Sequence, residues 1–179
     1  TNFSGCQNSL DDWTDESGAT WVSHSGNWQC LGNDVARAQQ RVPLGHTTVS
    51  IPYSTGLRVS THIYDISHQN NRSGPGLALL GDGNGGLVYV IYERDKARIV
   101  VGHSYAGGTG SAVFPYSGDL ESGTMVVDLV GPNLTVTFAG QDVGSYIVPA
   151  FAVDNTRFGL VANDDNQSRF DTFTIELLP

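Results

Sequence analysis

The sequence predicts an all-β protein, an antiparallel two-sheet β-sandwich of the jelly-roll kind. Apolar and β-branched residues alternate with polar ones over short segments, which is the period of half-buried strands. Gly, Asn, Asp and Pro interrupt these segments roughly every eight to twelve residues, a spacing typical of many-stranded sandwiches. No window carries a sustained helical stripe of apolar residues, and the 22 glycines would weaken any helix that formed.

Strands are expected along the whole chain, since no linker or repeat interrupts the pattern. In sequence order they run over Trp21 to Ser23, Trp28 to Leu31, Val35 to Gln39, Thr47 to Ile51, Gly56 to Ile66, Gly76 to Leu80, Leu87 to Glu93, Ala97 to Ser104, Gly123 to Val130, Asn133 to Phe138, Phe158 to Ala162 and Phe170 to Leu177.

Two of the turns follow from residue chemistry. The glycine-rich run from Gly81 to Gly86 supplies residues that tolerate positive φ, so we expect it to close a hairpin between two apolar strands. Gly131-Pro132-Asn133 is expected to do the same, with the proline fixing φ at the turn. Both runs are interpreted as hairpins and not as phosphate-binding loops.

The length of 179 residues fits one domain, which we place at residues 10–179. Residues 1–9 are interpreted as an N-terminal extension. Cys6 and Cys30 are the only cysteines, and a disulfide between them would stabilise the fold by roughly 3 to 4 kcal/mol in the loop-entropy model. The alternative is two unrelated buried thiols in a cytosolic protein.

The charge balance excludes several partners. With 18 acidic and 9 basic residues the net charge is -9, so nucleic acid and anionic membranes would be repelled. The apolar runs are much shorter than the roughly 20 residues that span a bilayer. Together with the cysteines, four glycosylation sequons indicate a secreted, extracellular or cell-surface protein; they begin at Asn2, Asn71, Asn133 and Asn166.

The order of features resembles the bacterial LamG-like modules of the concanavalin A-like lectin/glucanase superfamily. The resemblance covers nearly the whole chain and rests on Asp11-Asp12-Trp13, Gly26-Asn27-Trp28-Gln29, Gly76-Leu77-Ala78-Leu79-Leu80, Leu87-Val88-Tyr89-Val90-Ile91, Arg157-Phe158-Gly159-Leu160-Val161-Ala162 and Arg169-Phe170-Asp171-Thr172-Phe173-Thr174-Ile175. It implies two curved antiparallel sheets, adjacent N- and C-terminal strands, and often a structural calcium ion where those strands meet. Thr172 stands where the family often has Asn, and the cysteine-bearing extension is unusual.

The calcium ion that the resemblance implies would be held by Asp11 or Asp12 together with Asp171, because the family topology would bring these acids together. Carboxylate oxygens are the ligands that Ca²⁺ prefers. The alternative is that these are ordinary solvated or turn-capping acids.

A catalytic site is not expected. The glucanase branch carries Glu-x-Asp-x-x-Glu on one strand, and retaining hydrolysis needs two carboxyl groups about 5 Å apart. This chain has four glutamates and no such spacing. Lyases of this fold place a His and a Tyr over the sugar, whereas His62, Tyr64, His103 and Tyr105 here lack the surrounding motifs.

A sugar site would need aromatic faces for stacking and polar groups for the hydroxyls. Every second side chain of a strand points to the same face, so His62 shares a face with Tyr64, and His103 shares a face with Tyr105. If these faces align across one sheet, a shallow groove would be lined by Tyr64, Tyr89, Arg94, His103 and Tyr105. The alternative is that each of these side chains only packs, half-buried, on its own strand.

Three functions are therefore weighed. The first is a non-catalytic extracellular carbohydrate-binding module for a polysaccharide or other glycan. The second is a glycosylated structural subunit of a fibre, adhesin or surface assembly, which would associate with itself or with neighbouring domains of a larger secreted protein. The third and least favoured is a glycan hydrolase or lyase.

Overall fold

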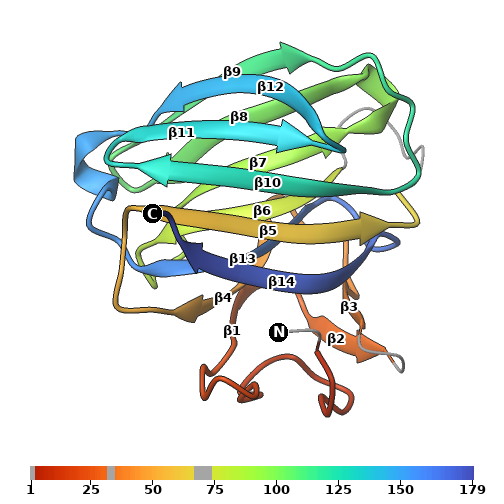
Figure 1. The fold of residues 1–179 in the computed structure, drawn as a ribbon. Helices are drawn as coiled ribbons and strands as arrows, with labels where there is room; N and C mark the ends of the chain where they lie inside the picture. Colours follow the sequence, from red (N-terminus) through yellow and green to blue (C-terminus); the bar gives the residue numbers. More distant parts are fainter. Residues whose placement is uncertain (1–2, 32–34, 67–73) are drawn as a thin grey trace.

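The computed structural model describes residues 3–31, 35–66 and 74–179. Within these ranges the chain forms two antiparallel sheets of seven strands each, packed face to face (Figure 1). In spatial order the first sheet consists of β1 (Val22–Ser25), β4 (Gly45–Ser50), β13 (Arg157–Asn163), β6 (Gly74–Gly81), β7 (Leu87–Glu93), β8 (Arg98–Tyr105) and β9 (Gly108–Pro115). The second consists of β12 (Gln141–Ile147), β11 (Asn133–Phe138), β10 (Gly123–Val130), β5 (Leu57–Tyr64), β14 (Arg169–Leu177), β3 (Val35–Ala38) and β2 (Trp28–Leu31).

Two short 3-10 turns complete the regular structure, η1 (Arg94–Lys96) and η2 (Ala150–Ala152). Neither they nor any other described helix is long and apolar enough to cross a membrane. The all-β sandwich predicted from the sequence is confirmed. Four strands, β2, β7, β10 and β11, begin and end at the predicted residues, and both predicted hairpin turns connect their strands.

Two strands were not predicted, and both stand at the edge of a sheet. They are β9 and β12, the last strands of the first and second sheets. Each lacks the alternating run of large apolar residues that marks the central strands, because an edge strand buries little of either face.

One connected core fills the space between the sheets, built from the inward-facing residues of each strand. The N-terminal segment takes part in it. Phe3 is buried and its ring lies 5.4 Å from that of Trp21, which in turn packs against Phe173 on β14 at 5.2 Å. Residues 3–9 are therefore anchored by core packing as well as by the Cys6–Cys30 disulfide, whose Cα atoms lie 5.8 Å apart.

Glycines in the first sheet allow its strands to approach closely. A Cβ at Gly76 on β6 would lie 1.7 Å from the Val90 carbonyl oxygen on β7, and one at Gly159 on β13 would lie 2.0 Å from that of Thr47 on β4. No side chain fits at such distances. The middle of this sheet thus depends on residues without a Cβ.

Candidate functional site

The five residues proposed as a groove lie in separate parts of the fold. Tyr64 is on the outer face of the second sheet, where the Arg169 guanidinium lies 6.0 Å from its ring centroid. Tyr89 is on the outer face of the first sheet, and its ring covers Gly102, where a Cβ would lie 2.5 Å from the Tyr89 hydroxyl. These two side chains therefore cannot share one face.

Arg94 on η1 is held in ion pairs. Its side chain is 8% exposed, its Nε donates to Asp119 at 2.6 Å, and its Nη1 donates to the Ile66 carbonyl. The carboxylate of Asp119 raises the Arg94 pKa still further. This arrangement secures a loop and leaves little of the guanidinium for a ligand.

The remaining two residues, His103 and Tyr105, do lie together, as expected for alternate residues of one strand. They sit at the end of β8, with their ring centroids 6.4 Å apart. Two residues from other elements join them, Tyr146 on β12 and Phe151 on η2. We call these four rings the aromatic cluster.

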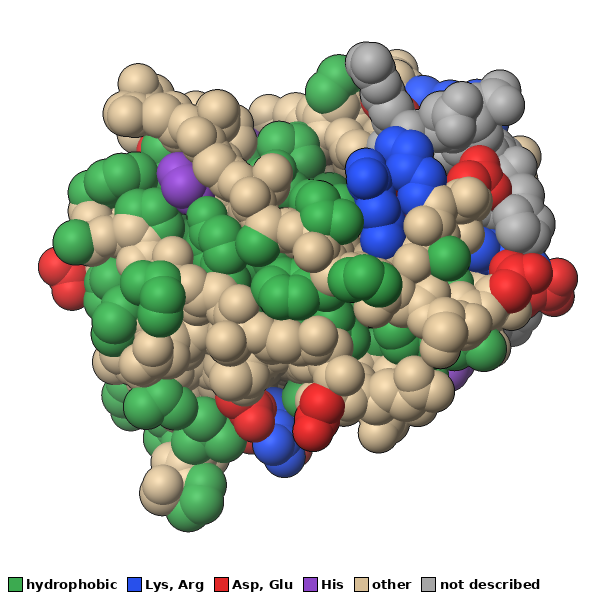
Figure 2. All heavy atoms as spheres, turned by 90° about the horizontal axis from the view of Figure 1, so that it is seen from above, with side chains coloured by type: hydrophobic (Ala, Val, Ile, Leu, Met, Phe, Trp, Pro, Cys, Tyr) green, Lys and Arg blue, Asp and Glu red, His purple; other side chains and the backbone are tan. Residues whose placement is uncertain are grey.

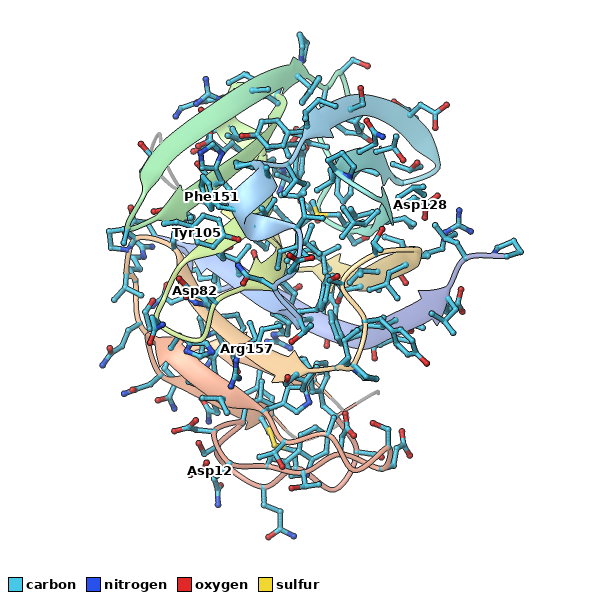
Figure 3. All side chains as sticks on the ribbon, turned by 90° about the vertical axis from the view of Figure 1, so that its left-hand side faces the viewer. Asp12, Asp82, Tyr105, Asp128, Phe151 and Arg157 are labelled. Carbon is cyan, nitrogen blue, oxygen red and sulfur yellow. A yellow bond between two sulfur atoms is a disulfide. The ribbon has the colours of Figure 1, made fainter. Side chains whose placement is uncertain are left out.

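Phe151 and Tyr105 of the aromatic cluster lie at one end of the sandwich (Figure 3). The Phe151 ring meets that of Tyr105 edge to face, with centroids 5.3 Å apart, and meets that of His103 at 6.2 Å. Tyr146 and His103 share a hydrogen bond of 2.6 Å between Oη and Nδ1. The cluster thus joins β8, β12 and η2 across the two sheets.

Within the cluster, Tyr105 is the fixed part and Phe151 the exposed part. The Tyr105 hydroxyl donates to the Leu80 carbonyl, and burial raises the pKa of this phenol strongly. The Phe151 side chain is 57% exposed. An exposed ring that packs against a half-buried, hydrogen-bonded ring offers an apolar platform to a ligand.

Polar groups flank this platform. Asp82, in the turn between β6 and β7, is exposed, and its Oδ1 accepts hydrogen bonds from the backbone of Asn84 and Gly86. A Cβ at Gly86 would lie 2.3 Å from Tyr105 Cδ1 and 2.5 Å from Asp82 Oδ2. The carboxylate therefore stands directly beside the Tyr105 ring, with Oδ2 accepting no hydrogen bond from the described residues.

Two further polar side chains complete the set. The Asn155 side chain forms a hydrogen bond with Tyr105, which partly offsets the effect of burial on the Tyr105 pKa. Arg157, at the start of β13, lies along the same turn, since a Cβ at Gly83 would be 3.1 Å from its Nε. Its guanidinium makes no salt bridge or hydrogen bond with another described residue. Figure 3 shows Phe151, Tyr105, Asp82 and Arg157 in succession along this end.

We call Phe151, Tyr105, Asp82, Asn155 and Arg157 the end site. Only Tyr105 was predicted. Phe151 was not predicted as a site residue because it lies in a loop without a strand pattern. Asp82 was not predicted because its turn was interpreted only as the connection of a hairpin. The sequence does contain one signal for this site. Phe151 is an aromatic residue in a loop between Pro149 and Asn155, where no strand pattern explains it.

A second feature, a hollow with a volume of 340 Å³, lies between the N-terminal segment, the loop after β4 and the end of β14. Its lining is mostly apolar, with Tyr53 half-exposed at its rim and the carboxylates of Asp15 and Glu176 among its walls. The Asp15 carboxylate stabilises a local turn, since its Oδ1 accepts hydrogen bonds from the backbone N–H groups of Ser17 and Ala19.

The three predicted calcium ligands do not converge on one point. The Asp11 carboxylate accepts from the Ser23 backbone on β1, in the first sheet, whereas Asp171 is on β14 in the second sheet and pairs with His62. Asp12 is exposed at a positive φ of 61°. Among the described residues no three His, Cys, Asp or Glu side chains form a group that could hold a metal. Calcium binding by Asp11 or Asp12 with Asp171 stays a prediction.

Two of the four sequons lie within the described residues. Asn133, at the start of β11, is exposed, and its Nδ2 donates to the nearby Val130 carbonyl. Asn166 is half-buried, and its Oδ1 accepts from Arg41. Asn2 and Asn71 lie outside the described residues. Glycosylation stays a prediction, with Asn133 the more accessible position.

Comparison with known proteins defines the class of fold. No protein-family model matches the sequence, and no curated protein matches it either. Among solved structures, the CBM66 carbohydrate-binding module of Bacillus subtilis has a TM-score of 0.71 at 15% identity, covering 87% of this chain and 94% of the module. A Bacillus subtilis protein of unknown function with a galectin-like fold has a TM-score of 0.61 at 11% identity, covering 96% and 97%. The galectin LEC-6 of Caenorhabditis elegans has a TM-score of 0.57 at 11% identity, covering 78% and 93%.

The chain therefore has a jelly-roll β-sandwich fold similar to that of galectins and of the CBM66 module. At these identities the likeness shows the fold alone.

Proposed function

We propose that the chain is a non-catalytic carbohydrate-binding module, secreted or displayed at the cell surface, that holds a glycan at the end site. One observation carries the proposal. The exposed Phe151 ring packs edge to face against the half-buried Tyr105 ring. Beside them lie a carboxylate oxygen of Asp82 and the Arg157 guanidinium, neither of which hydrogen-bonds to another described residue. An aromatic face stacks on the apolar face of a pyranose ring, while charged groups bond its hydroxyls.

Other features support this proposal. The disulfide agrees with an oxidising, extracellular compartment. The names of two structural neighbours, a carbohydrate-binding module and a galectin, agree with glycan recognition on this fold, as does the LamG-like resemblance of the sequence. The absence of a paired-carboxylate spacing in the sequence agrees with binding in place of hydrolysis.

The test is a glycan array followed by calorimetric titration of the best ligand. We expect Phe151→Ala to weaken binding by at least about tenfold, which corresponds to ~1.4 kcal/mol. Arg157→Ala should weaken it as well. The matched control is Tyr53→Ala, because Tyr53 is an aromatic residue with a similar exposed fraction, 50%, and it lies at the separate hollow.

Phe151→Ala should leave the unfolding temperature nearly unchanged, because the ring is largely in solvent. Equal affinities for wild type and both end-site variants would reject the end site. A wild-type protein that binds no glycan on the array would reject the function itself.

The alternative, a structural subunit of an extracellular assembly, is favoured by one feature of its own, the exposed edge formed by β9. Such a subunit would bind a neighbour through this edge whether or not the end site binds sugar.

A further inference from the structure

Among the strands of the described residues, β9 is the last in the first sheet and pairs with a neighbour on one side only, β8. It is eight residues long and pairs with β8 over its whole length without a bulge. Its sequence, Gly-Thr-Gly-Ser-Ala-Val-Phe-Pro, contains no charged residue. A long, regular, uncharged edge is the kind that readily accepts another strand.

The other three edge strands are protected in ways that natural sheets commonly use. At the far edge of the first sheet, β1 has four residues and a break in register. At the edges of the second sheet, β2 also has four residues, and β12 carries Asp142 and a register shift against β11. Short strands, charges and bulges each discourage pairing with another chain. Within the described residues, β9 alone has only a terminal proline as protection.

The register of β9 shows which of its backbone groups are free. The Tyr116 N–H donates to the Ala97 carbonyl, and hydrogen-bonded pairs alternate along an antiparallel ladder. Residues 108, 110, 112 and 114 therefore direct their backbone groups toward β8. Thr109, Ser111 and Val113 direct theirs away from the sheet, toward solvent.

The surface around this edge is apolar. Val113 on β9 is 51% exposed and Ile147 on β12 is 64% exposed. Figure 2, which looks onto this edge from above, shows hydrophobic side chains across its middle, with acidic side chains at its margins. Phe114 lies beneath, against Gly144 of β12.

Charge restricts where a second copy of this chain could bind. Two copies with a net charge of -9 each repel one another over most of their surfaces. Contact between copies is least unfavourable where acidic residues are absent, and β9 is such a segment. A strand that meets itself across a two-fold axis is also antiparallel, which matches the ladder it would extend.

We propose that β9 pairs with β9 of a second copy about a two-fold axis at Ser111, joining two first sheets into one continuous sheet. In this register Ser111 faces the partner's Ser111, and Thr109 faces the partner's Val113. All three outward-directed residues then form hydrogen-bonded pairs, giving about six bonds between chains, two for each pair. The inference does not depend on glycan binding.

The first test is the molar mass in solution by light scattering after size-exclusion chromatography, from about 1 μM to about 1 mM. We expect a rise from the monomer to twice its mass. Ser111→Pro should abolish the dimer, because its ring replaces the central outward N–H while the ladder to β8 keeps its bonds. Ser111→Ala, which keeps that N–H, should remain dimeric.

A charged side chain introduced at the same edge tests the dimer without changing a backbone hydrogen-bond donor. Val113→Lys should also give a monomer, and Val130→Lys is its matched control, because Val130 is 57% exposed at the β10–β11 turn. A wild type that stays monomeric to about 1 mM would overturn the proposal. A dimer that survives both Ser111→Pro and Val113→Lys would overturn it equally.

A cross-link tests the register. Paired residues in this position have Cα atoms about 5.5 Å apart, within disulfide range. Ser111→Cys should therefore give a covalent dimer on oxidation. Thr109→Cys should not, because the Cα atoms of the two copies of residue 109 would lie about 15 Å apart. Efficient cross-linking of Thr109→Cys but not of Ser111→Cys would reject the two-fold axis at Ser111.

Discussion

The Tyr146 hydroxyl on β12 and the His103 imidazole on β8 share a hydrogen bond of 2.6 Å, which connects the two sheets beside their free edges. Both side chains are half-buried. The same imidazole packs against Phe151 at 6.2 Å. One polar contact thus links the second sheet to the strand that carries Tyr105.

Tyr146→Phe should lower the free energy of unfolding by about 1 kcal/mol, the net contribution of a typical buried hydrogen bond. The aromatic contact would remain, so only the loss of the hydroxyl is measured. Urea denaturation followed by tryptophan fluorescence provides the measurement. Tyr53→Phe, at an exposed hydroxyl, should leave the midpoint unchanged; an equal midpoint for Tyr146→Phe would show that the bond contributes nothing.

Gly76→Ala should destabilise the fold by roughly 2 to 4 kcal/mol, because the new Cβ would collide with the Val90 carbonyl and force β6 and β7 apart. Gly107→Ala is the control, since a Cβ there meets nothing within 4 Å. It should change stability by less than about 0.5 kcal/mol. Thermal unfolding of both variants checks the difference, and similar losses in the two would contradict the close approach of the strands.

Removing the disulfide with the double variant Cys6→Ala/Cys30→Ala should lower stability by about 3 kcal/mol, since the bridge closes a loop of 24 residues in the unfolded chain. Chemical denaturation of the variant and of oxidised wild type measures this. Reduction of the wild type should reproduce the loss. Coincident denaturation curves for oxidised and reduced protein would show that Phe3 packing alone anchors the segment.

The stability should fall as the pH is lowered through about 6.5. His24 and His46 stack at 5.1 Å, and burial lowers the pKa of both below the ordinary value of 6.5; for His24 the neighbouring His46 and Arg157 lower it further. In this pH range the unfolded chain binds protons that the folded chain does not, so acid favours unfolding.

The measurement is the free energy of unfolding at pH 7.5 and pH 5.5. The variant His24→Gln/His46→Gln should lose less stability between these two values than the wild type. An identical loss in both proteins would assign the pH dependence to the carboxylates instead.

Sequence patterning predicted the central strands well because burial on both faces leaves a nearly continuous apolar run, as in Leu87–Glu93. It failed at β9 and β12, where no such burial exists. Glycine and serine in Gly108–Pro115 resemble a loop in composition, and only pairing with β8 makes this segment a strand.

The candidate site was harder to predict. The alternation of side chains along a strand shows which residues share a face, but it does not show to which sheet the strand belongs. Tyr64 and Tyr89 looked equivalent in sequence, yet the chain crosses from the second sheet to the first between β5 and β6. The pairing of Val88, not Tyr89, with His103 placed Tyr89 on the opposite face from the aromatic cluster. Phe151 and Arg157 reach the end site only through long-range packing.

The β8–β9 hairpin contributes Tyr105 to the end site and also forms the free edge, since Tyr105 at the end of β8 pairs with Gly108 at the start of β9. In a two-fold pair the two hairpins would point in opposite directions. Each dimer would then be a bivalent cross-linker with its sugar sites facing apart. On a surface that displays many copies of one glycan, such geometry would raise avidity by roughly 10² to 10⁴ without any new contact to sugar.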